Sequence, residues 1–157
     1  MHFHKPRIRP VLNLLLICHA NVCRSRMAEC VFRQVLFNAE GERVLSAGLA
    51  AVSGKPVHEL VKTVLLERGY TIPSELSSVR LIAPMLAWAD LVLVMETAQR
   101  REIVRRHPTM AGKVWTLGHW LDCEIHDPVC GDKARFDATL TLIERSARSW
   151  LPVLVPQ

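Results

Sequence analysis

Two kinds of apolar pattern alternate along the chain. Short, almost continuous apolar runs predict buried strands at residues 11–17, 43–46, 91–95 and 113–117. Apolar residues that recur every three or four positions predict helices at residues 25–38 and 57–68. A polar, arginine-rich helix is expected at residues 97–106, ended by His107-Pro108, and a closing helix at residues 135–150. Wholly apolar strands that alternate with helices are typical of a parallel sheet with helices on both faces. The pattern therefore predicts a three-layer α/β sandwich around a four-stranded parallel sheet.

The length and composition are those of one folded domain. The chain has 157 residues, of which 50% are hydrophobic and 22% are charged. That balance excludes disordered, collagen-like and coiled-coil classes. No repeat or linker divides the sequence, so we expect a flexible basic lead at residues 1–10 and a single domain at residues 11–157.

The cysteines, the apolar runs and the net charge indicate the environment and the partners. Five cysteines without regular spacing argue against a disulfide-bonded secreted module and favour a reducing cytoplasm. The first apolar run contains Asn13, and no run reaches the roughly 18 residues of a membrane span, so we expect no membrane insertion. The net charge of +5 suits an anionic partner. Nucleic acid is not expected, because no recognition motif is present and aromatic residues are only 6%.

The loop after the first predicted strand carries the candidate chemistry. Cys18 and Arg24 stand six positions apart, between a buried strand and the start of a helix. Backbone N–H groups and the helix dipole favour an anion in such a loop, and the same field favours a thiolate. Arg24 can hold two oxygens of a tetrahedral oxyanion, and Ser25 can donate its hydroxyl to the sulfur. Asn21 tolerates left-handed backbone angles that a tight turn needs. An isolated cysteine at a strand end is more often a core residue, but this position favours a nucleophile.

Several stretches, in the same order, are similar to one known family. Residues 14–29 read Leu-Leu-Leu-Ile-Cys-His-Ala-Asn-Val-Cys-Arg-Ser-Arg-Met-Ala-Glu, which resembles the signature loop of the low-molecular-weight protein tyrosine phosphatases. The resemblance continues through residues 46–48, 89–96, 112–120, 126–128 and 142–148, and covers roughly residues 11–150. The stretches Gly-Lys-Val and Glu-Arg-Ser-Ala-Arg are similar to the bacterial branch that serves exopolysaccharide systems.

The resemblance implies hydrolysis of protein phosphotyrosine and small aryl phosphates, without a metal or another cofactor. Cys18 would form a phosphocysteine, Arg24 would stabilise the transferred phosphoryl group, and Asp127 would act as general acid and then as base. The implied partner is a phosphotyrosine protein, with the tail of a bacterial membrane tyrosine kinase as the candidate. The implied fold is flavodoxin-like, with the phosphate loop after strand 1. The loop residues that would bind phosphate or another oxyanion are His19, Ala20, Asn21, Val22, Cys23 and Ser25.

Two residues outside the loop complete the implied site. Spacing alone does not select Asp127, because the stretch 122–137 contains other acidic residues. Pro128 favours it by biasing Asp127 towards an extended backbone. The resemblance also implies that Ser46 supports the loop through a hydrogen bond to Asn21.

The sequence departs from the family pattern at three positions. Alanine stands at position 20, where glycine is common, and we expect backbone strain there if φ is positive. Arg26 replaces a usual proline near the start of the first helix. Val129 replaces the tyrosine that usually follows Asp-Pro and lines the pocket for an aromatic ring, so the preference for phosphotyrosine is less secure than the cysteine chemistry.

Alternatives remain for the other cysteines and for a basic segment. In the family, the residue at Cys23 forms a protective disulfide with the nucleophile. Cys123 and Cys130 raise the alternative of an arsenate reductase of the same fold, although the family places its shuttle cysteines earlier in the chain. A phosphate-binding module without catalysis is a further alternative. The arginine-rich stretch 99–107 is typical of a solvated helix face and could instead dock an acidic tail.

Overall fold

The computed structural model describes residues 12–36, 43–74 and 76–155. The predicted lead at residues 1–10 and the end of the first predicted helix, Asn38, lie outside the described residues. Four strands, β1 (Leu14–Cys18), β2 (Val44–Gly48), β3 (Leu91–Val94) and β4 (Val114–Thr116), form a parallel sheet in the order β2-β1-β3-β4. The α-helices are α1 (Arg24–Val35), α2 (Glu59–Glu67), α3 (Ala83–Trp88), α4 (Thr97–Arg106) and α5 (Lys133–Leu154). Two 3-10 helices, η2 (Pro108–Lys113) and η3 (His119–Leu121), flank β4.

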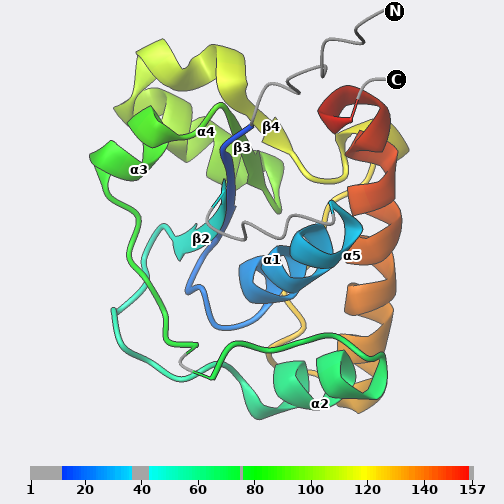
Figure 1. Cartoon of the computed structure of the whole chain (residues 1–157). Coiled ribbons are helices and arrows are strands. Elements are labelled where there is room, and N and C mark those ends of the chain that lie inside the picture. The colour runs from blue at the N-terminus through cyan, green and yellow to red at the C-terminus, as the bar shows by residue number, and fades with distance from the viewer. Residues whose placement is uncertain (1–11, 37–42, 75, 156–157) are drawn as a thin grey trace, which may run out of the picture.

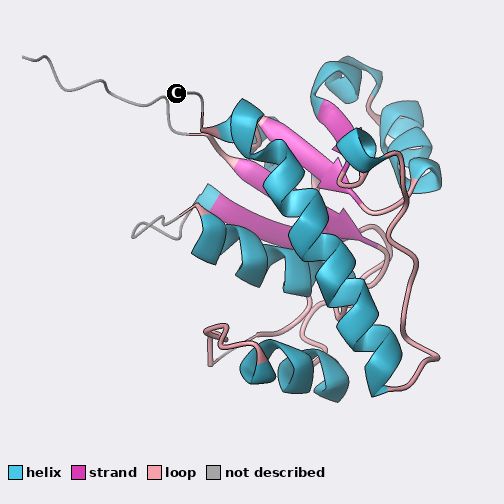
Figure 2. Cartoon of the chain, turned by 90° about the vertical axis from the view of Figure 1, so that its right-hand side faces the viewer, coloured by secondary structure: helices cyan, strands magenta, loops and turns pink. Residues whose placement is uncertain are grey.

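The helices form a layer on each face of the sheet (Figures 1 and 2). Successive side chains of β1 point to opposite faces, so that Leu14 and Leu16 belong to one core and Leu15 and Ile17 to the other. The first core is shared with α1, α2 and α5, and the second with α3 and α4. Because β1 is central and completely buried, its carboxyl end at Cys18 lies at the middle of one sheet edge.

All eight predicted elements are present, with shifted ends. The predicted strand 11–17 is observed at Leu14–Cys18, and the predicted helix 135–150 extends over Lys133–Leu154. The helix at Thr97–Arg106 has the predicted bounds. The fold-class prediction, a sandwich with a four-stranded parallel sheet, is confirmed. Within the part of the chain that the structure describes, no helix is long and apolar enough to cross a membrane.

One α-helix was not predicted. α3 has six residues and carries Pro84 in its first turn. It is too short to show a helical period in its apolar positions, and Leu86 is its one fully buried side chain. Leu86 packs in the core on that face of the sheet and so anchors the short helix.

Candidate active site

The loop between β1 and α1 folds tightly around the sulfur of Cys18. The Ser25 Oγ lies 2.9 Å from the Cys18 Sγ, and the backbone N–H of Asn21 donates to the same sulfur at 3.2 Å. Cys18 is only 2% exposed, and Asn21 and Ser25 are completely buried. α1 begins at Arg24, so its N-terminal N–H groups face the loop. This arrangement favours an anion beside the sulfur.

Asn21 is the residue that makes the turn possible. Its φ is +57°, and among the described non-glycine residues only Asn21 and Asp122 have a positive φ. The strain expected at Ala20 is therefore absent, because the left-handed position is one residue later. The Asn21 Nδ2 donates to Ser25 Oγ at 2.7 Å and to Ser46 Oγ at 3.0 Å, and its Oδ1 accepts from the Val79 N–H at 2.8 Å. The expected contact between Ser46 and Asn21 is thus present.

Gly48 allows the loop to lie directly against the end of β2. A Cβ at this position would stand 2.7 Å from the His19 carbonyl oxygen and 2.8 Å from the Asn21 nitrogen. Both are backbone atoms, which cannot rotate away as a side chain could. The Leu49 N–H also donates to the Cys18 carbonyl at 3.0 Å, so the loop and the strand end are fixed to each other.

Arg24 connects the loop to the segments after β3 and η3. Its buried guanidinium pairs with Glu96 and donates to the Ile125 carbonyl at 2.8 Å. Its Nη2 lies 3.7 Å from Asp127 Oδ2. Sequence reasoning missed Glu96, although its position directly after a parallel strand places it at the same sheet edge as Cys18.

Asp127 lies in a much more open environment. Its side chain is 43% exposed, and its Oδ1 accepts from the Val129 N–H at 3.1 Å. Val129 is itself 44% exposed, so it offers an apolar surface at the position where the family usually has a tyrosine.

A cavity of about 320 Å³ opens beside Arg24 and Asp127. Its lining comprises His19, Arg24, Leu49, Glu96, Ala98, Gln99, Glu102 and Asp127. None of these lining residues is Phe, Tyr or Trp.

The structure brings most of the predicted site residues together. Arg24 lies next to Asp127, and hydrogen bonds join Cys18 to Ser25, Ser25 to Asn21 and Asn21 to Ser46. His19 lines the cavity, whereas Cys23 is buried. Burial, together with the charges of Asp127 and Cys18, raises the pKa of the Cys23 thiol to about 12. Cys23 therefore stays protonated at neutral pH.

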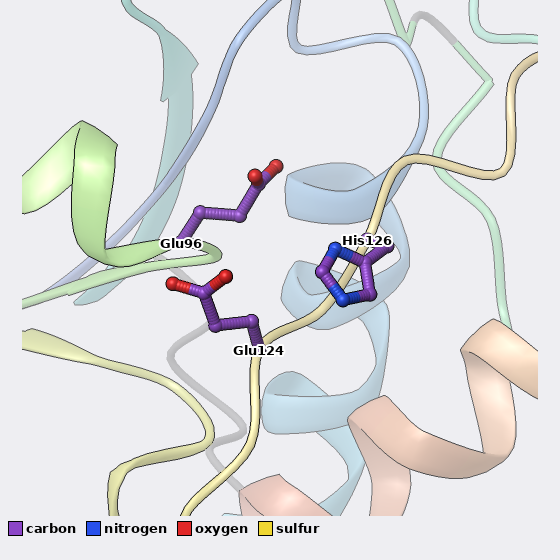
Figure 3. Close-up of side chains that lie close together, drawn as sticks. All are labelled: Glu96, Glu124 and His126. Atoms are coloured by element: carbon purple, nitrogen blue, oxygen red, sulfur yellow. The ribbon is translucent and has the colours of Figure 1, made fainter.

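Three potential metal ligands lie next to the site (Figure 3). Single ligand atoms of Glu96, Glu124 and His126 all lie within 4.8 Å of one another. Both carboxylates already have protein partners, because Glu96 pairs with Arg24 and Glu124 accepts from the Thr97 N–H at 2.7 Å. That backbone hydrogen bond lowers the pKa of Glu124. These contacts account for both carboxylates without a cation.

Comparisons with known proteins agree with this geometry. Residues 13–156 match the family model described as low molecular weight phosphotyrosine protein phosphatase. The probable low molecular weight protein-tyrosine-phosphatase EpsP of Ralstonia solanacearum is 37% identical over 142 residues, which are 90% of this chain and 95% of EpsP. The tyrosine phosphatase Wzb from Escherichia coli K30, in complex with sulphate, has a TM-score of 0.83 at 29% identity and covers 91% of this chain and 99% of Wzb. The YwlE arginine phosphatase from Geobacillus stearothermophilus has a TM-score of 0.83 at 27% identity and covers 91% of this chain and 92% of YwlE.

The chain belongs to the low molecular weight phosphotyrosine protein phosphatase family, and it is a phosphatase. The family resemblance noted in the sequence is confirmed. EpsP and Wzb are exopolysaccharide-associated members, so the similarity to that bacterial branch is confirmed as well. The comparisons favour neither of the two alternatives, the arsenate reductase and the module without catalysis.

Proposed function

We propose that this protein hydrolyses protein phosphotyrosine through a phosphocysteine formed on Cys18. One observation carries the proposal: Ser25 Oγ and the Asn21 N–H converge on the Cys18 sulfur in a loop whose Arg24 reaches to 3.7 Å from Asp127. Two successive displacements at phosphorus require a nucleophile with hydrogen-bond donors, an oxyanion-binding arginine and a carboxyl group near that arginine.

In the first displacement, the Cys18 Sγ forms a bond to phosphorus and the bond from phosphorus to the tyrosine oxygen breaks. Asp127 donates a proton to the departing oxygen, so that a neutral phenol leaves. Arg24 and the N–H groups of residues 19–25 hold the equatorial oxygens as their charge develops. Glu96 keeps the Arg24 guanidinium in place through their ion pair.

In the second displacement, Asp127 removes a proton from water, and the water oxygen attacks phosphorus. The sulfur–phosphorus bond breaks, and inorganic phosphate leaves. The Ser25 hydroxyl stabilises the departing thiolate through its contact with the sulfur. Because the thiolate must stay reduced, this mechanism suits the cytoplasm.

The substrate proposal rests on relatives and on the open face of the site. EpsP and Wzb are named protein-tyrosine phosphatases, and the Wzb structure holds an oxyanion. The exposed face of α4, which includes Arg101 and Arg105, supports docking of an acidic phosphotyrosine segment such as a membrane kinase tail. Arg100 instead donates to the Val114 and Ala111 carbonyls and serves the fold.

The test is hydrolysis of p-nitrophenyl phosphate in the presence of a chelator. We expect turnover by the wild type, none by Cys18→Ser, and a loss of about 10²–10⁴-fold in kcat for Asp127→Asn. Cys123→Ser is the cysteine control. We expect wild-type hydrolysis from it, because Cys123 has no part in the proposed mechanism and only an arsenate reductase would need this residue. Full activity of Cys18→Ser would refute the mechanism.

Phosphopeptides decide the substrate class. Peptides with phosphotyrosine, phosphoserine and phosphoarginine are compared at equal concentration, the last because of the similarity to YwlE. A higher kcat/KM for phosphotyrosine is the expected result. A preference for phosphoarginine or phosphoserine would contradict the substrate proposal and leave the cysteine mechanism intact.

A further inference from the structure

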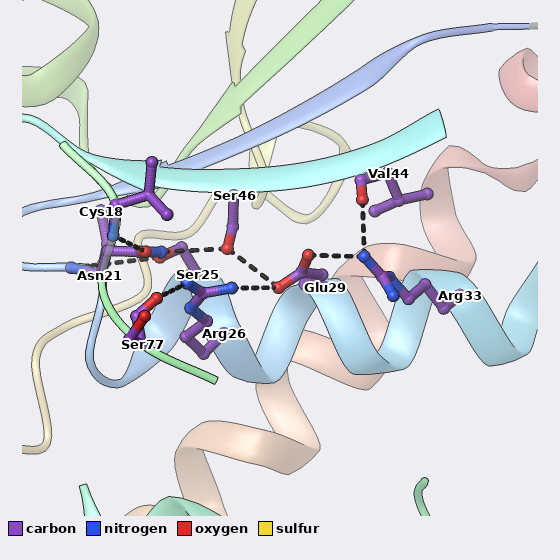
Figure 4. Close-up of polar contacts among 10 residues, drawn as sticks. Cys18, Asn21, Ser25, Arg26, Glu29, Arg33, Val44, Ser46 and Ser77 are labelled. Atoms are coloured by element: carbon purple, nitrogen blue, oxygen red, sulfur yellow. Dashed lines mark hydrogen bonds and ion pairs between the residues drawn. The ribbon is translucent and has the colours of Figure 1, made fainter. Parts of the chain in front are cut away.

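A continuous series of buried hydrogen bonds leads away from the nucleophile (Figure 4). It runs from Cys18 Sγ to Ser25 Oγ at 2.9 Å, then to Asn21 Nδ2 at 2.7 Å and on to Ser46 Oγ at 3.0 Å. Ser46 Oγ in turn donates to Glu29 Oε2 at 3.0 Å. The series therefore joins the reactive sulfur to a carboxylate on α1 that is only 4% exposed.

The carboxylate fixes the direction of every proton in this series. An ionised carboxylate only accepts hydrogen bonds, so the Ser46 hydroxyl must point at Glu29 and its oxygen must accept from Asn21. The Asn21 Oδ1 accepts from the Val79 N–H, so its amide nitrogen must face the two serines. The second amide proton then goes to Ser25 Oγ. Among the described residues, the remaining acceptor within reach of the Ser25 proton is the Cys18 sulfur.

Two arginines hold Glu29 in this position. Arg33 Nη2 lies 2.9 Å from Glu29 Oε1, and Arg26 Nη1 lies 2.9 Å from Oε2, the oxygen that Ser46 also contacts. Pairing of this kind is what allows a carboxylate to remain charged away from water. Arg26 is itself 6% exposed, two residues after Arg24, at the position where the family usually has proline.

Arg26 also reaches the loop by a second path. Its Nη2 donates to the carbonyl of Ser77, in the segment whose Val79 N–H holds the side chain of Asn21. Arg26 thus acts on Asn21 both through Glu29 and Ser46 and through the segment 77–79. Arg33 shares the first path, because it holds the other Glu29 oxygen, but it lacks the second path, because its remaining contact is with the Val44 carbonyl.

We propose that Arg26 is a positioning residue for the nucleophile: it holds Glu29 and the segment 77–79 so that the Ser25 hydroxyl donates to the Cys18 sulfur. This inference rests on the proposed function, because it assigns Arg26 a part in stabilising the Cys18 thiolate. The residue does not touch the substrate. Its action passes through side chains that are buried behind the loop.

The experiment measures how alkylation of Cys18 by iodoacetamide depends on pH, with mass spectrometry to identify the modified residue. For Arg26→Ala we expect the midpoint of the alkylation profile to move up by about one pH unit, since the thiolate loses an ordered donor and a nearby cation. kcat for p-nitrophenyl phosphate falls with it, whereas KM changes little. An Arg26→Ala profile equal to that of the wild type overturns the inference.

Arg68→Ala is the matched control. Like Arg26, Arg68 contacts both a carboxylate, Glu144, and a backbone carbonyl, that of Asp137, and it also pairs with the Asp137 side chain, but it lies at the end of α2. We expect this variant to lower thermal stability without moving the alkylation midpoint. A shift as large as that of Arg26→Ala would show that general destabilisation moves the profile, and the inference would fail.

Arg26→Lys separates geometry from charge. Lysine keeps the positive charge but lacks the planar fork that reaches Glu29 and Ser77 together. We expect it to recover only part of the shift, and full recovery would reduce the effect to charge and overturn the positioning role. Where Arg26→Ala does not fold, the near-isosteric Glu29→Gln serves instead, with an upward shift expected and a wild-type profile contradicting the inference.

The two proposals fail in different ways. Hydrolysis that persists in Cys18→Ser refutes the proposed function whatever the alkylation profiles show. Hydrolysis that needs Cys18, together with an unchanged profile for Arg26→Ala, refutes the role of Arg26 alone.

Discussion

The proposed phosphate loop (residues 18–25) and the proposed acid loop (residues 122–132) meet at Arg24, but the protein holds them very differently. In the phosphate loop, Cys18, Asn21 and Ser25 are buried and joined by hydrogen bonds. In the acid loop, Asp127 is 43% exposed, and its Oδ1 accepts from the neighbouring Val129 N–H. This difference suits the proposed mechanism, in which Cys18 and Arg24 are held in fixed positions, whereas Asp127 exchanges protons with water and admits a leaving group.

The largest effect is expected from a methyl group at Gly48. Gly48→Ala places a Cβ against the backbone of His19 and Asn21, so the phosphate loop must move. We expect a loss of about 1–3 kcal/mol in the free energy of unfolding and of nearly all activity. Thermal unfolding and p-nitrophenyl phosphate hydrolysis measure both. Gly112→Ala is the control, because a Cβ there meets no atom within 4 Å; equal behaviour of the two variants would contradict the tight contact.

A smaller loss of activity is expected when the turn residue Asn21 is replaced. Asn21→Ala keeps the positive φ but removes the side-chain bonds to Ser25, Ser46 and Val79. Unpaired buried groups and left-handed backbone strain cost about 1–3 kcal/mol, and kcat falls about 10–100-fold as the loop loses order. Asn13→Ala, which removes an amide bond to the Trp88 carbonyl, is the control. Wild-type kcat in Asn21→Ala would show that the loop backbone alone holds the site.

In the acid loop, we expect a substitution at Val129 to raise the selectivity for phosphotyrosine instead of lowering activity. Val129→Tyr supplies an aromatic surface beside Asp127 at an exposed position, where it meets little steric opposition. Ring stacking of about 0.5–1.5 kcal/mol corresponds to a severalfold increase in kcat/KM for phosphotyrosine over alkyl phosphates. Val153→Tyr, on the distant end of α5, is the control. No change in this ratio would show that Val129 does not face the substrate.

The smallest expected effect is a difference in how fast the cysteines around the site are alkylated. Burial is the main cause that raises the pKa of Cys23 to about 12 and that of Cys30 to about 11, so both stay protonated, and therefore unreactive, well above pH 8. Brief iodoacetamide treatment at pH 7 should modify Cys18 and leave these two intact, with the exposed Cys130 as an internal reference. Peptide mapping that finds Cys23 modified as fast as Cys18 would contradict this order.

Much of the fold could be predicted from local pattern. The apolar runs predicted four strands, and the three-to-four-residue spacing predicted α1 and α2, because strong periodicity reflects burial directly. α4 was predicted as a polar, arginine-rich helix before His107-Pro108, and α5 as the closing helix. α3 was missed because a six-residue helix shows no period. The left-handed position of the turn is Asn21, the residue whose type favours that backbone, and the condition for strain at Ala20, a positive φ there, is not met.

By itself, the sequence determined the sheet, the loop between Cys18 and Arg24, and the family to which the protein belongs. Those features depend on residue types at short, fixed spacing. Only the tertiary structure decided that Glu96 pairs with Arg24 and that Arg26 and Glu29 stand behind the nucleophile through Ser46. Such contacts join residues up to 72 positions apart, and they form only where the parallel strands end at a common edge and α1 packs against β2.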